Sequence, residues 1–259
     1  QATLSALLGV ELLAEAGLPD GVFQVVLGHG EPTGQAVVDL ADYVCFTGST
    51  ATGRKVAEAA GRRLVSFSLE LGGKNALYVA PDANLARAVE GAVRGCFSSA
   101  GQLCISAERV IVHTDIYDEF VEAFVAAVTA MRLGTGLHFG IDMGSLVSAK
   151  QLETVTRHVE DARAKGARVL AGGRARPDLG PYVYEPTVLE GVTSTMECRD
   201  QETFGPVVSL YRVASDAEAI ALANDTEYGL NSSIWTRDIA RGRAIAPQMR
   251  QLIRGGGSE

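Results

Sequence analysis

Short apolar segments alternate with helix-forming segments along the first part of the chain. Within residues 1–71, the pattern predicts strands at Val22–Leu27, Tyr43–Phe46 and Arg63–Leu71. It predicts helices at Pro32–Leu40 and at Thr50–Ala60, the second of them ended by Gly61. This order of strand, helix and strand is typical of βαβ units, in which the strands form a parallel sheet.

The alternation continues with stronger periodicity from Asn75 onward. Further strands are expected at Asn75–Val79, Arg109–His113, Val207–Tyr211 and Ser232–Trp235. Helices are expected over Leu85–Phe97, through Phe120, Phe124, Val128 and Met131, from Ser148, and from near Ser215. At the start of the third, Gln151 would complete a capping box with Ser148. Residues 172–202 are expected to be rich in loops, and a domain boundary is expected near Gly72–Gly73.

Composition narrows the classes of protein that this chain can represent. Its 259 residues are 47% hydrophobic and 21% charged, which suffices for a sizeable core and excludes a disordered or collagen-like chain. The net charge is −8 and there is no basic run, so we expect no binding to nucleic acid or to an anionic membrane surface. The longest stretch without a charged residue, 95–107, is shorter than the roughly 20 residues of a membrane-spanning helix.

Cysteine usage favours a reducing compartment. Cys45, Cys96, Cys104 and Cys198 are too few and too scattered for a disulfide framework. They lack the paired spacing of a structural zinc site, and the histidines lie far from them in the sequence, so no metal is expected. With no recognisable signal or transit peptide, we expect a cytoplasmic protein.

Cys104 is the first candidate for chemistry. Cys96 falls on the apolar face of its predicted helix and is expected to pack as a small core residue. Gly101 interrupts the helical pattern, which places Cys104 in the turn formed by residues 98–106. A thiol in a turn beside oriented backbone N–H groups can be stabilised as the thiolate, which is the reactive form. A role in packing alone is the alternative.

Glu70 is the second candidate, since it ends an apolar strand and precedes Leu71-Gly-Gly-Lys-Asn75. Burial would raise the pKa of this carboxyl group toward the range of a general base. The alternative is a carboxylate that is satisfied by neighbouring backbone N–H groups.

Two glycine-rich turns are weaker candidates for a phosphate site. Residues 28–34 contain GxG after a predicted strand but lack the full GxGxxG fingerprint. Residues 48–53 lie between a predicted strand and a predicted helix, where backbone N–H groups can receive a pyrophosphate. Ordinary tight turns explain either segment equally well.

Six motifs then combine in one order along the chain. They are FTGSTATG (46–53), LELGGKN (69–75), GQLCIS (101–106), EP (185–186), ETFGPVV (202–208) and NDTEYGLNSS (224–233). In this order, and in the 34-residue separation of Glu70 and Cys104, the sequence resembles the NAD(P)-dependent aldehyde dehydrogenase superfamily over nearly its whole length. The resemblance implies an α/β fold, with a partial Rossmann-type cofactor domain and an α/β catalytic domain containing a parallel sheet. Residues 1–72 would be the C-terminal part of the NAD(P)-binding domain, 73–254 the catalytic domain and 255–259 an irregular tail.

The resemblance also implies roles for single residues. Cys104 matches the nucleophile, which attacks the aldehyde to give a thiohemiacetal and, after hydride leaves for the nicotinamide, a thioester. Glu70 matches the general base that activates the hydrolytic water. The residues implied to contact NAD or NADP are Gly48, Ser49 and Gly53 at the pyrophosphate, Leu71 beside them, Glu202 and Phe204 at the nicotinamide ribose and ring, and Gln151 on the ribose side. For Gln151 the capping box offers a purely structural explanation.

Departures from the family pattern concern the two ends of the chain. The asparagine that completes the family's oxyanion hole, and the residues that recognise the adenosine ribose, would lie before Gln1. The final strands that close the substrate tunnel and build the oligomer would lie after Met249. We therefore expect a fragment that is poorly active by itself, cut from a longer protein that forms a homo-oligomer. The choice between NAD and NADP is left open.

The substrate implied by the resemblance is a small aldehyde. Residues 98–106 and 178–186 resemble an actinobacterial branch that is assigned to succinate-semialdehyde oxidation. Ser98 stands where better-defined enzymes of that kind carry an arginine for the substrate carboxylate. Two other functions remain open at this point: a non-catalytic fragment of such an enzyme, and a cysteine-dependent esterase.

Overall fold

The structure, a computed structural model, describes residues 2–136 and 139–250. The chain divides into two compact units, Gln1–Leu71 and Gly72–Glu259. Each unit has its own sheet and its own cluster of buried apolar side chains.

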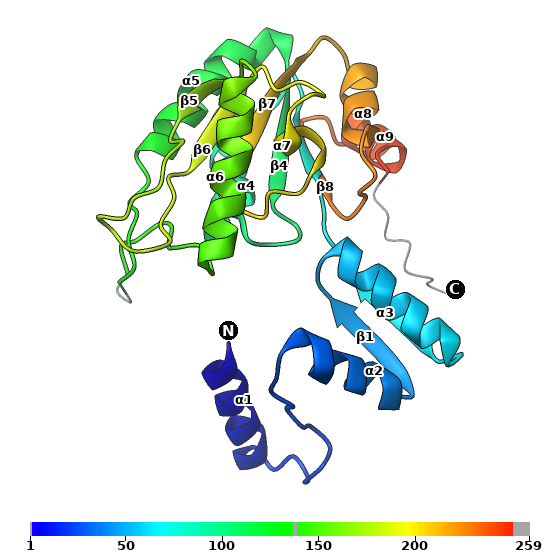
Figure 1. Ribbon diagram of the computed structural model, residues 1–259. Coiled ribbons are helices and arrows are strands. Elements are labelled where there is room, and N and C mark those ends of the chain that lie inside the picture. The colour runs from blue at the N-terminus through cyan, green and yellow to red at the C-terminus, as the bar shows by residue number, and fades with distance from the viewer. Residues whose placement is uncertain (1, 137–138, 251–259) are drawn as a thin grey trace. The chain divides into compact units, whose positions relative to one another are not determined.

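The first unit is built around one βαβ element (Figure 1). Its helices and strands are α1 (Thr3–Glu15), η1 (Gly30–Gly34), α2 (Gln35–Leu40), β1 (Tyr43–Thr47), α3 (Thr50–Arg62) and β2 (Ser66–Glu70). Strands β1 and β2 pair in parallel, with Tyr43 opposite Ser66 and Thr47 opposite Glu70. Buried Ala59 and Ala60 on α3 pack near Val38 and Val44, and these small side chains let the helix lie close to its neighbours.

Two expectations about where strands and helices of the first unit begin and end are wrong. Residues 22–27 form no strand, and Val22 and Val26 are exposed. The unit's described sheet contains only β1 and β2, so this apolar segment has no neighbouring strand to satisfy its backbone groups. Gly61 does not end α3, which continues to Arg62; the left-handed residue that follows the helix is Leu64, with a φ of 56°.

The second unit contains a larger sheet whose strand order is β5-β6-β7-β4-β3-β8. The strands are β3 (Asn75–Val79), β4 (Ala107–His113), β5 (Arg168–Ala171), β6 (Thr187–Glu190), β7 (Val207–Val213) and β8 (Ser232–Trp235). All neighbouring pairs in it are parallel except β5 with β6. The helices are α4 (Leu85–Phe97), η2 (Ser98–Gly101), η3 (Thr114–Ile116), α5 (Tyr117–Thr129), α6 (Ala149–Ala164), α7 (Glu197–Asp200), α8 (Asp216–Asn224), α9 (Ile239–Ile245) and η4 (Ala246–Gln248).

Alternating side chains of the central strands fill two separate cores. On β3, Leu77 and Val79 join the larger cluster, which includes residues of α4, α5 and α6. Ala76 and Tyr78 point the other way and join a second cluster with residues of α8 and α9. Both faces of β3 are therefore buried, in keeping with the apolar run of residues 76–79, which is typical of a parallel strand with a neighbour on each side.

The sequence missed some short elements of the second unit. Residues 172–202, expected to be rich in loops, contain strand β6 and helix α7, and strand β5 precedes them. These elements are each four residues long, which is too short for an apolar period to stand out. Met131 lies beyond α5, which ends at Thr129. The other strands and helices expected in this unit form at the predicted places.

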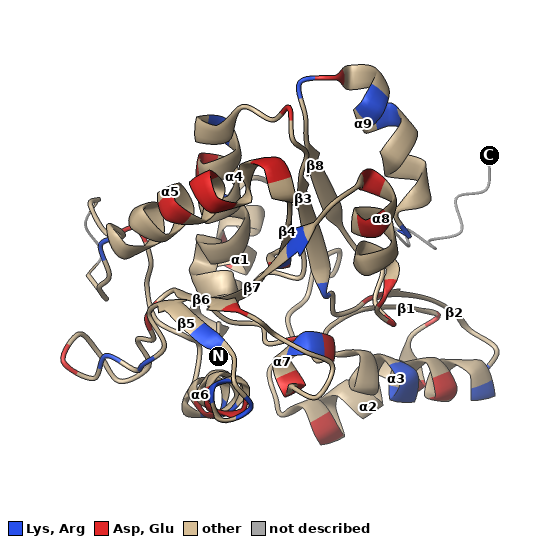
Figure 2. Cartoon of the chain, turned by 90° about the horizontal axis from the view of Figure 1, so that it is seen from above, with Lys and Arg blue, Asp and Glu red and all other residues tan. Residues whose placement is uncertain are grey.

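Charged residues of both signs are spread over the helices of the second unit (Figure 2). Helix α5 carries Asp118, Glu119 and Glu122 and has no basic residue. Among the described residues, no helix combines the length and apolar character needed to cross a membrane. The residues that the structure describes also contain no group of three or more His, Cys, Asp or Glu side chains that could hold a metal ion.

Candidate active site

Cys104 lies in a turn, as the sequence predicts, and its side chain is partly accessible. The preceding residues Ser99, Ala100 and Gly101 all have a positive φ, of 52°, 56° and 69°. Two consecutive non-glycine residues in this region store strain, which native structures tend to keep at functional sites. By contrast, Cys96 and Cys198 are buried, and burial raises the pKa of both thiols. Cys104 therefore differs from the two buried cysteines in that its side chain is partly accessible.

The side chain of Gln102 anchors the turn that precedes Cys104. Its amide nitrogen donates to the carbonyl of Ser99 at 3.0 Å and to that of Ser145 at 3.3 Å. Its amide oxygen accepts from the N–H of Val147 at 2.8 Å. These bonds tie the turn to residues more than forty positions further along the chain.

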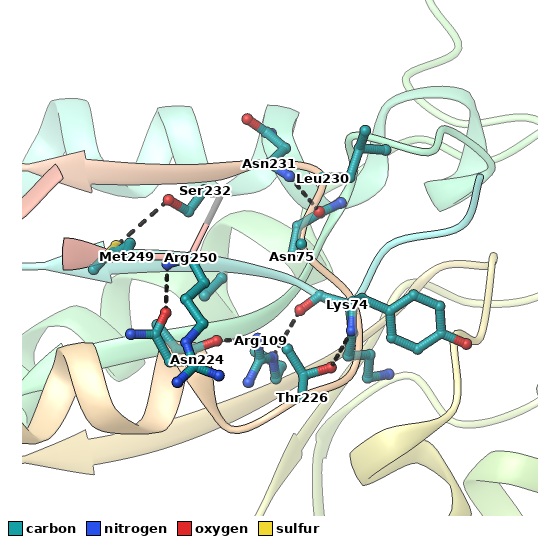
Figure 3. A pocket seen from close by; sticks show the side chains of 14 residues that line it. Lys74, Asn75, Arg109, Asn224, Thr226, Leu230, Asn231, Ser232, Met249 and Arg250 are labelled. Atoms are coloured by element: carbon teal, nitrogen blue, oxygen red, sulfur yellow. Dashed lines mark hydrogen bonds between the residues drawn. The ribbon is translucent and has the colours of Figure 1, made fainter. Parts of the chain in front are cut away.

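Two asparagines bind the backbone carbonyls that follow the thiol. The Asn75 amide nitrogen donates to the carbonyls of Cys104 and Ser106, at 2.7 and 2.8 Å. The Asn231 amide donates to the intervening carbonyl of Ile105 at 3.1 Å, and the Asn231 N–H donates to Asn75 Oδ1 at 3.0 Å (Figure 3). Three successive carbonyls are thereby fixed, so the peptide planes that follow Cys104 have little freedom to rotate.

The cavity drawn in Figure 3 is separate from the thiol. It is lined by residues of β3, β4 and β8 and of the segments around α8 and η4, including Arg109 and Arg250. With about 20 Å³ of free space, it holds no more than about one water molecule. The buried Arg109 guanidinium donates to the carbonyls of Lys74, Leu222 and Ala223, each at 2.8 Å. We assign this cavity a structural role.

Residues 72–73 bind Glu202 and also lie close to the turn that contains Cys104. The Glu202 carboxylate accepts the Gly73 N–H at 2.8 Å. Burial raises the pKa of Glu202, and the nearby Glu108 adds to the rise, while the Gly73 N–H opposes it. A Cβ at Gly72 would lie 2.4 Å from a Glu202 oxygen, and one at Gly73 would lie 2.8 Å from the Cys104 carbonyl. Only glycine allows both close approaches.

Phe204 adopts a strained backbone conformation, with a φ of 49°. The Gln151 amide nitrogen donates to the carbonyls of Thr203 and Phe204, at 2.8 and 2.9 Å. The predicted capping box is therefore only half correct. The Ser148 hydroxyl accepts the Gln151 N–H as expected, but the Gln151 side chain reaches the strained loop instead of returning to the helix start.

A buried ion pair supports the same loop from its other side. Lys74 and Glu108 pair with each other at exposures of 2% and 4%. The Glu108 carboxylate also accepts the N–H groups of Thr203 and Phe204, at 2.9 and 2.8 Å. Beneath the loop, His158 Nδ1 lies 3.1 Å from the Thr203 hydroxyl. The carbonyls and the N–H groups of residues 203 and 204 are thus both engaged.

Sequence reasoning did not assign roles to several of these residues: Lys74, Asn75, Gln102, Glu108, His158 and Asn231. One signal was available in the sequence, because a charged residue within an otherwise apolar buried strand requires a partner. The buried strand Ala107–His113 carries two such residues, Glu108 and Arg109, among apolar ones.

In the first unit, residues 48–53 form a turn and a helix start. Ser49 caps α3, with its hydroxyl accepting the Thr52 N–H at 3.3 Å. Gly53 has no room for a side chain, since a Cβ would lie 2.4 Å from a Leu71 methyl carbon. The Gly48 N–H donates to the Glu70 carbonyl at 3.0 Å, which fixes the turn to the end of β2. The first turn of α3 contains no acidic residue that would repel an anion at this helix start.

The environment of Glu70 differs from the expected one. The residue ends strand β2 as predicted, but the strand is exposed or half-buried along its length and Glu70 itself is exposed. Burial of the carboxylate therefore does not occur in the first unit, because no described element of that unit covers this end of β2. The expectation of a buried strand was wrong.

The predicted site residues thus fall into two groups. Cys104, Gln151, Glu202 and Phe204 belong to the second unit, where shared contacts with residues 72–75 and 101–108 bring their loops together. The residues of the first unit are Gly48, Ser49, Gly53, Glu70 and Leu71.

Comparison with known proteins gives this arrangement a context. A model described as the aldehyde dehydrogenase family matches residues 1–252. The chain belongs to the aldehyde dehydrogenase family. Among curated members, it is 56% identical over 250 residues to a protein of Mycobacterium ulcerans named "Putative succinate-semialdehyde dehydrogenase [NADP(+)] 2". It is 42% identical over 246 residues to glutarate-semialdehyde dehydrogenase of Pseudomonas putida.

These two alignments cover 96% and 93% of the present chain but only 48% and 50% of the relatives. The chain therefore spans about half the length of the curated aldehyde dehydrogenases that it matches.

Solved structures of the family share the fold described above. The crystal structure of PnpE from Pseudomonas sp. WBC-3 matches with a TM-score of 0.92 and 43% identity, over 96% of this chain and 52% of that one. Betaine aldehyde dehydrogenase from Staphylococcus aureus, in complex with NAD+, matches with a TM-score of 0.88 and 33% identity, over 93% and 49%. The predicted fold class, α/β with a largely parallel sheet, is confirmed.

Proposed function

We propose that this chain carries the nucleophile and part of the cofactor site of an aldehyde dehydrogenase that uses NAD or NADP. One observation supports the proposal above the others. The Cys104 turn and the Glu202–Phe204 loop, which come from distant parts of the chain, are both bound by residues 73–75. That shared support favours one common site for the partly accessible thiol and the residues implied to hold a nicotinamide.

The proposed chemistry begins with the Cys104 sulfur, which attacks the aldehyde carbon. A C–S bond forms while the carbonyl π electrons move to oxygen, and the backbone N–H of Cys104 is a candidate donor to that oxyanion. The carbonyl re-forms as hydride leaves the same carbon, which gives a thioester on Cys104. Water then attacks the thioester, with Glu70 taking its proton, so that the C–S bond breaks and the carboxylic acid is released.

The residues present fit a nicotinamide dinucleotide. The N-terminus of α3 offers backbone N–H groups to a pyrophosphate, with Gly48, Ser49, Gly53 and Leu71 shaping the approach. In the second unit, Glu202 offers a carboxylate to ribose hydroxyls, and Gln151 fixes the backbone at Phe204. When bound, the nicotinamide supplies the acceptor for the hydride. Gln151 thus supports the cofactor site through the loop backbone, whether or not it also touches the ribose.

For the substrate we propose a semialdehyde with a terminal carboxylate, with succinate semialdehyde as the specific candidate. The names of the mycobacterial and pseudomonad relatives support this class. Ser98, which stands where an arginine would bind the carboxylate, is exposed at the end of α4. A kcat/KM for succinate semialdehyde no higher than that for an uncharged aldehyde of equal length would exclude a carboxylate anchor.

We propose that the whole protein acts in the cytoplasm as a homo-oligomer, without nucleic acid or membrane partners. The unpaired state of Cys45, Cys96, Cys104 and Cys198 supports a reducing compartment. A molar mass of one polypeptide by light scattering at micromolar concentration would contradict the oligomer.

One kinetic comparison tests the proposed function. Cys104→Ala should abolish aldehyde-dependent reduction of NAD+ or NADP+, because the covalent step has no substitute. Cys45→Ser, which changes an exposed cysteine of the first unit, should leave that reduction unchanged. Glu70→Gln should give a burst of reduced cofactor without turnover, since the thioester forms but is not hydrolysed. Equal steady-state rates for Glu70→Gln and the parent would refute the base, and activity in Cys104→Ala would refute the nucleophile.

A further inference from the structure

We infer that residues Gly72–Asn75 act as a two-sided positioning element, with Asn75 setting the Cys104 turn while Gly73 and Lys74 set the Glu202–Phe204 loop. The inference rests on the proposed function and deepens it. It concerns residues that touch neither aldehyde nor cofactor in the proposed chemistry.

The side toward the nucleophile consists of hydrogen bonds to backbone carbonyls. Asn75 is 3% exposed and begins strand β3, which is paired on both sides, with β4 and with β8, so its own position is rigid. Its amide nitrogen binds the carbonyls of Cys104 and Ser106, and its oxygen is held by the Asn231 N–H. The amide therefore has a fixed orientation, with both hydrogens on the turn. Drawing the Cys104 carbonyl toward Asn75 keeps that oxygen away from an oxyanion on substrate bound to the same residue.

The side toward the cofactor loop consists of a backbone N–H and a buried charge. The Gly73 N–H binds the Glu202 carboxylate directly. Lys74 acts through Glu108, whose carboxylate accepts the lysine ammonium and the N–H groups of Thr203 and Phe204. Without the lysine, Glu108 would be a buried anion with only two N–H donors, an arrangement that disfavours its charged form.

The backbone geometry explains why the contacts to the Cys104 turn and the contacts to the Glu202–Phe204 loop point in opposite directions. Adjacent side chains of an extended segment point to opposite sides, so Lys74 and Asn75 reach different loops. Gly73 adjoins both loops, since its N–H binds Glu202 and a Cβ added to it would lie 2.8 Å from the Cys104 carbonyl oxygen. A short stretch of chain therefore fixes the spacing between the sulfur and the loop at Phe204. Because a misplacement of about 1 Å can cost on the order of 10²-fold in rate, this spacing matters for the reaction.

The experiment uses two readouts on the same variants. The first is the rate at which p-nitrophenyl acetate acylates Cys104, followed by peptide mass spectrometry; this step needs the thiol but no cofactor. The second is amide hydrogen exchange in the segment 202–206, reported by the N–H groups before Pro206, which has none. Asn75→Ala should slow acylation on the order of tenfold and leave exchange in 202–206 unchanged. The double variant Lys74→Met with Glu108→Gln leaves no buried charge unpaired. It should speed exchange in 202–206 on the order of tenfold and leave acylation within about twofold.

A matched control comes from the other part of strand β3. The buried Tyr78 hydroxyl donates to Asp216 at 2.6 Å, and Tyr78 contacts neither loop. Tyr78→Phe should weaken the fold without changing either readout. If the Asn75 and Lys74/Glu108 variants each change both readouts to the same extent, the residues have a general structural role and the inference is wrong. If acylation of the parent occurs on a residue other than Cys104, the proposed function itself fails.

Discussion

At the scale of single residues, the sequence identified groups whose chemistry is local and missed groups whose partners are distant. Cys104 was placed in a turn because a glycine nearby breaks a helical pattern. The Ser148 cap was correct because its partner is three residues away. The capping-box prediction for the Gln151 side chain is wrong for the opposite reason, since its amide reaches carbonyls 52 and 53 residues further on. No local rule predicts such a contact.

His158 provides a prediction at this scale. It is 1% exposed, and burial lowers its pKa to about 4, with Lys74 and Arg157 adding to the decrease and Glu108 opposing it. Its Nε2 lies 3.7 Å from the Glu197 carboxylate, and Thr203 faces Nδ1. Above pH 6.5 the imidazole is neutral in both the folded and the unfolded chain. Between pH 6.5 and 4 the unfolded chain binds a proton that the folded one does not, so stability falls as the pH falls.

His158→Gln should remove this dependence while keeping a polar partner for Thr203. Between pH 7 and pH 5, we expect the parent's free energy of unfolding to drop by about 2 kcal/mol more than that of the variant. Urea unfolding at the two pH values measures the difference. Parallel losses of stability in the two proteins would show that His158 is not held neutral.

At the scale of elements, apolar periodicity predicted the long central strands and helices of the second unit well. It failed where an element is short, as at β5 and β6, where an apolar segment has no partner strand, as at residues 22–27, and at the first helix, Thr3–Glu15, which was not predicted. It also could not reveal the left-handed turn of residues 99–101, because two of these residues are not glycine. Strain of this kind is imposed by the surroundings.

Gly101 provides the test of that turn. Its φ is positive, and a Cβ would lie 2.1 Å from the Gly205 carbonyl oxygen, which joins the cysteine turn to the cofactor loop. Gly101→Ala should therefore push the two loops apart, costing roughly 2–4 kcal/mol in unfolding free energy and slowing alkylation of Cys104 at least severalfold.

The control for Gly101→Ala is Gly95→Ala. Gly95 lies within helix α4, and its added Cβ would meet the nearest atom, on Leu77, at 3.8 Å. This change should stabilise the protein by up to about 1 kcal/mol, because alanine favours a helix, and it should leave Cys104 reactivity unchanged. Thermal unfolding and iodoacetamide labelling compare the two variants, and equal behaviour would mean that the turn tolerates a side chain.

At the scale of the whole molecule, the chain combines two units with different parts of one proposed chemistry. The second unit holds the nucleophile and the nicotinamide-side loop, and the first holds the helix start and Glu70. Family membership was predictable because six motifs keep their order over the chain. The network that joins the motifs was not, since Glu108 and Asn231 act through contacts that exist only after folding.

The most direct measurement of the central claim is the location of the acyl group. Glu70→Gln protein is mixed with succinate semialdehyde and NADP+, quenched in acid, and digested for peptide mass spectrometry. The account predicts a succinyl thioester on the peptide that contains Cys104, and none on the peptide that contains Cys45. Reduction of NADP+ with the acyl group on another residue, or with no acylated peptide, would contradict it.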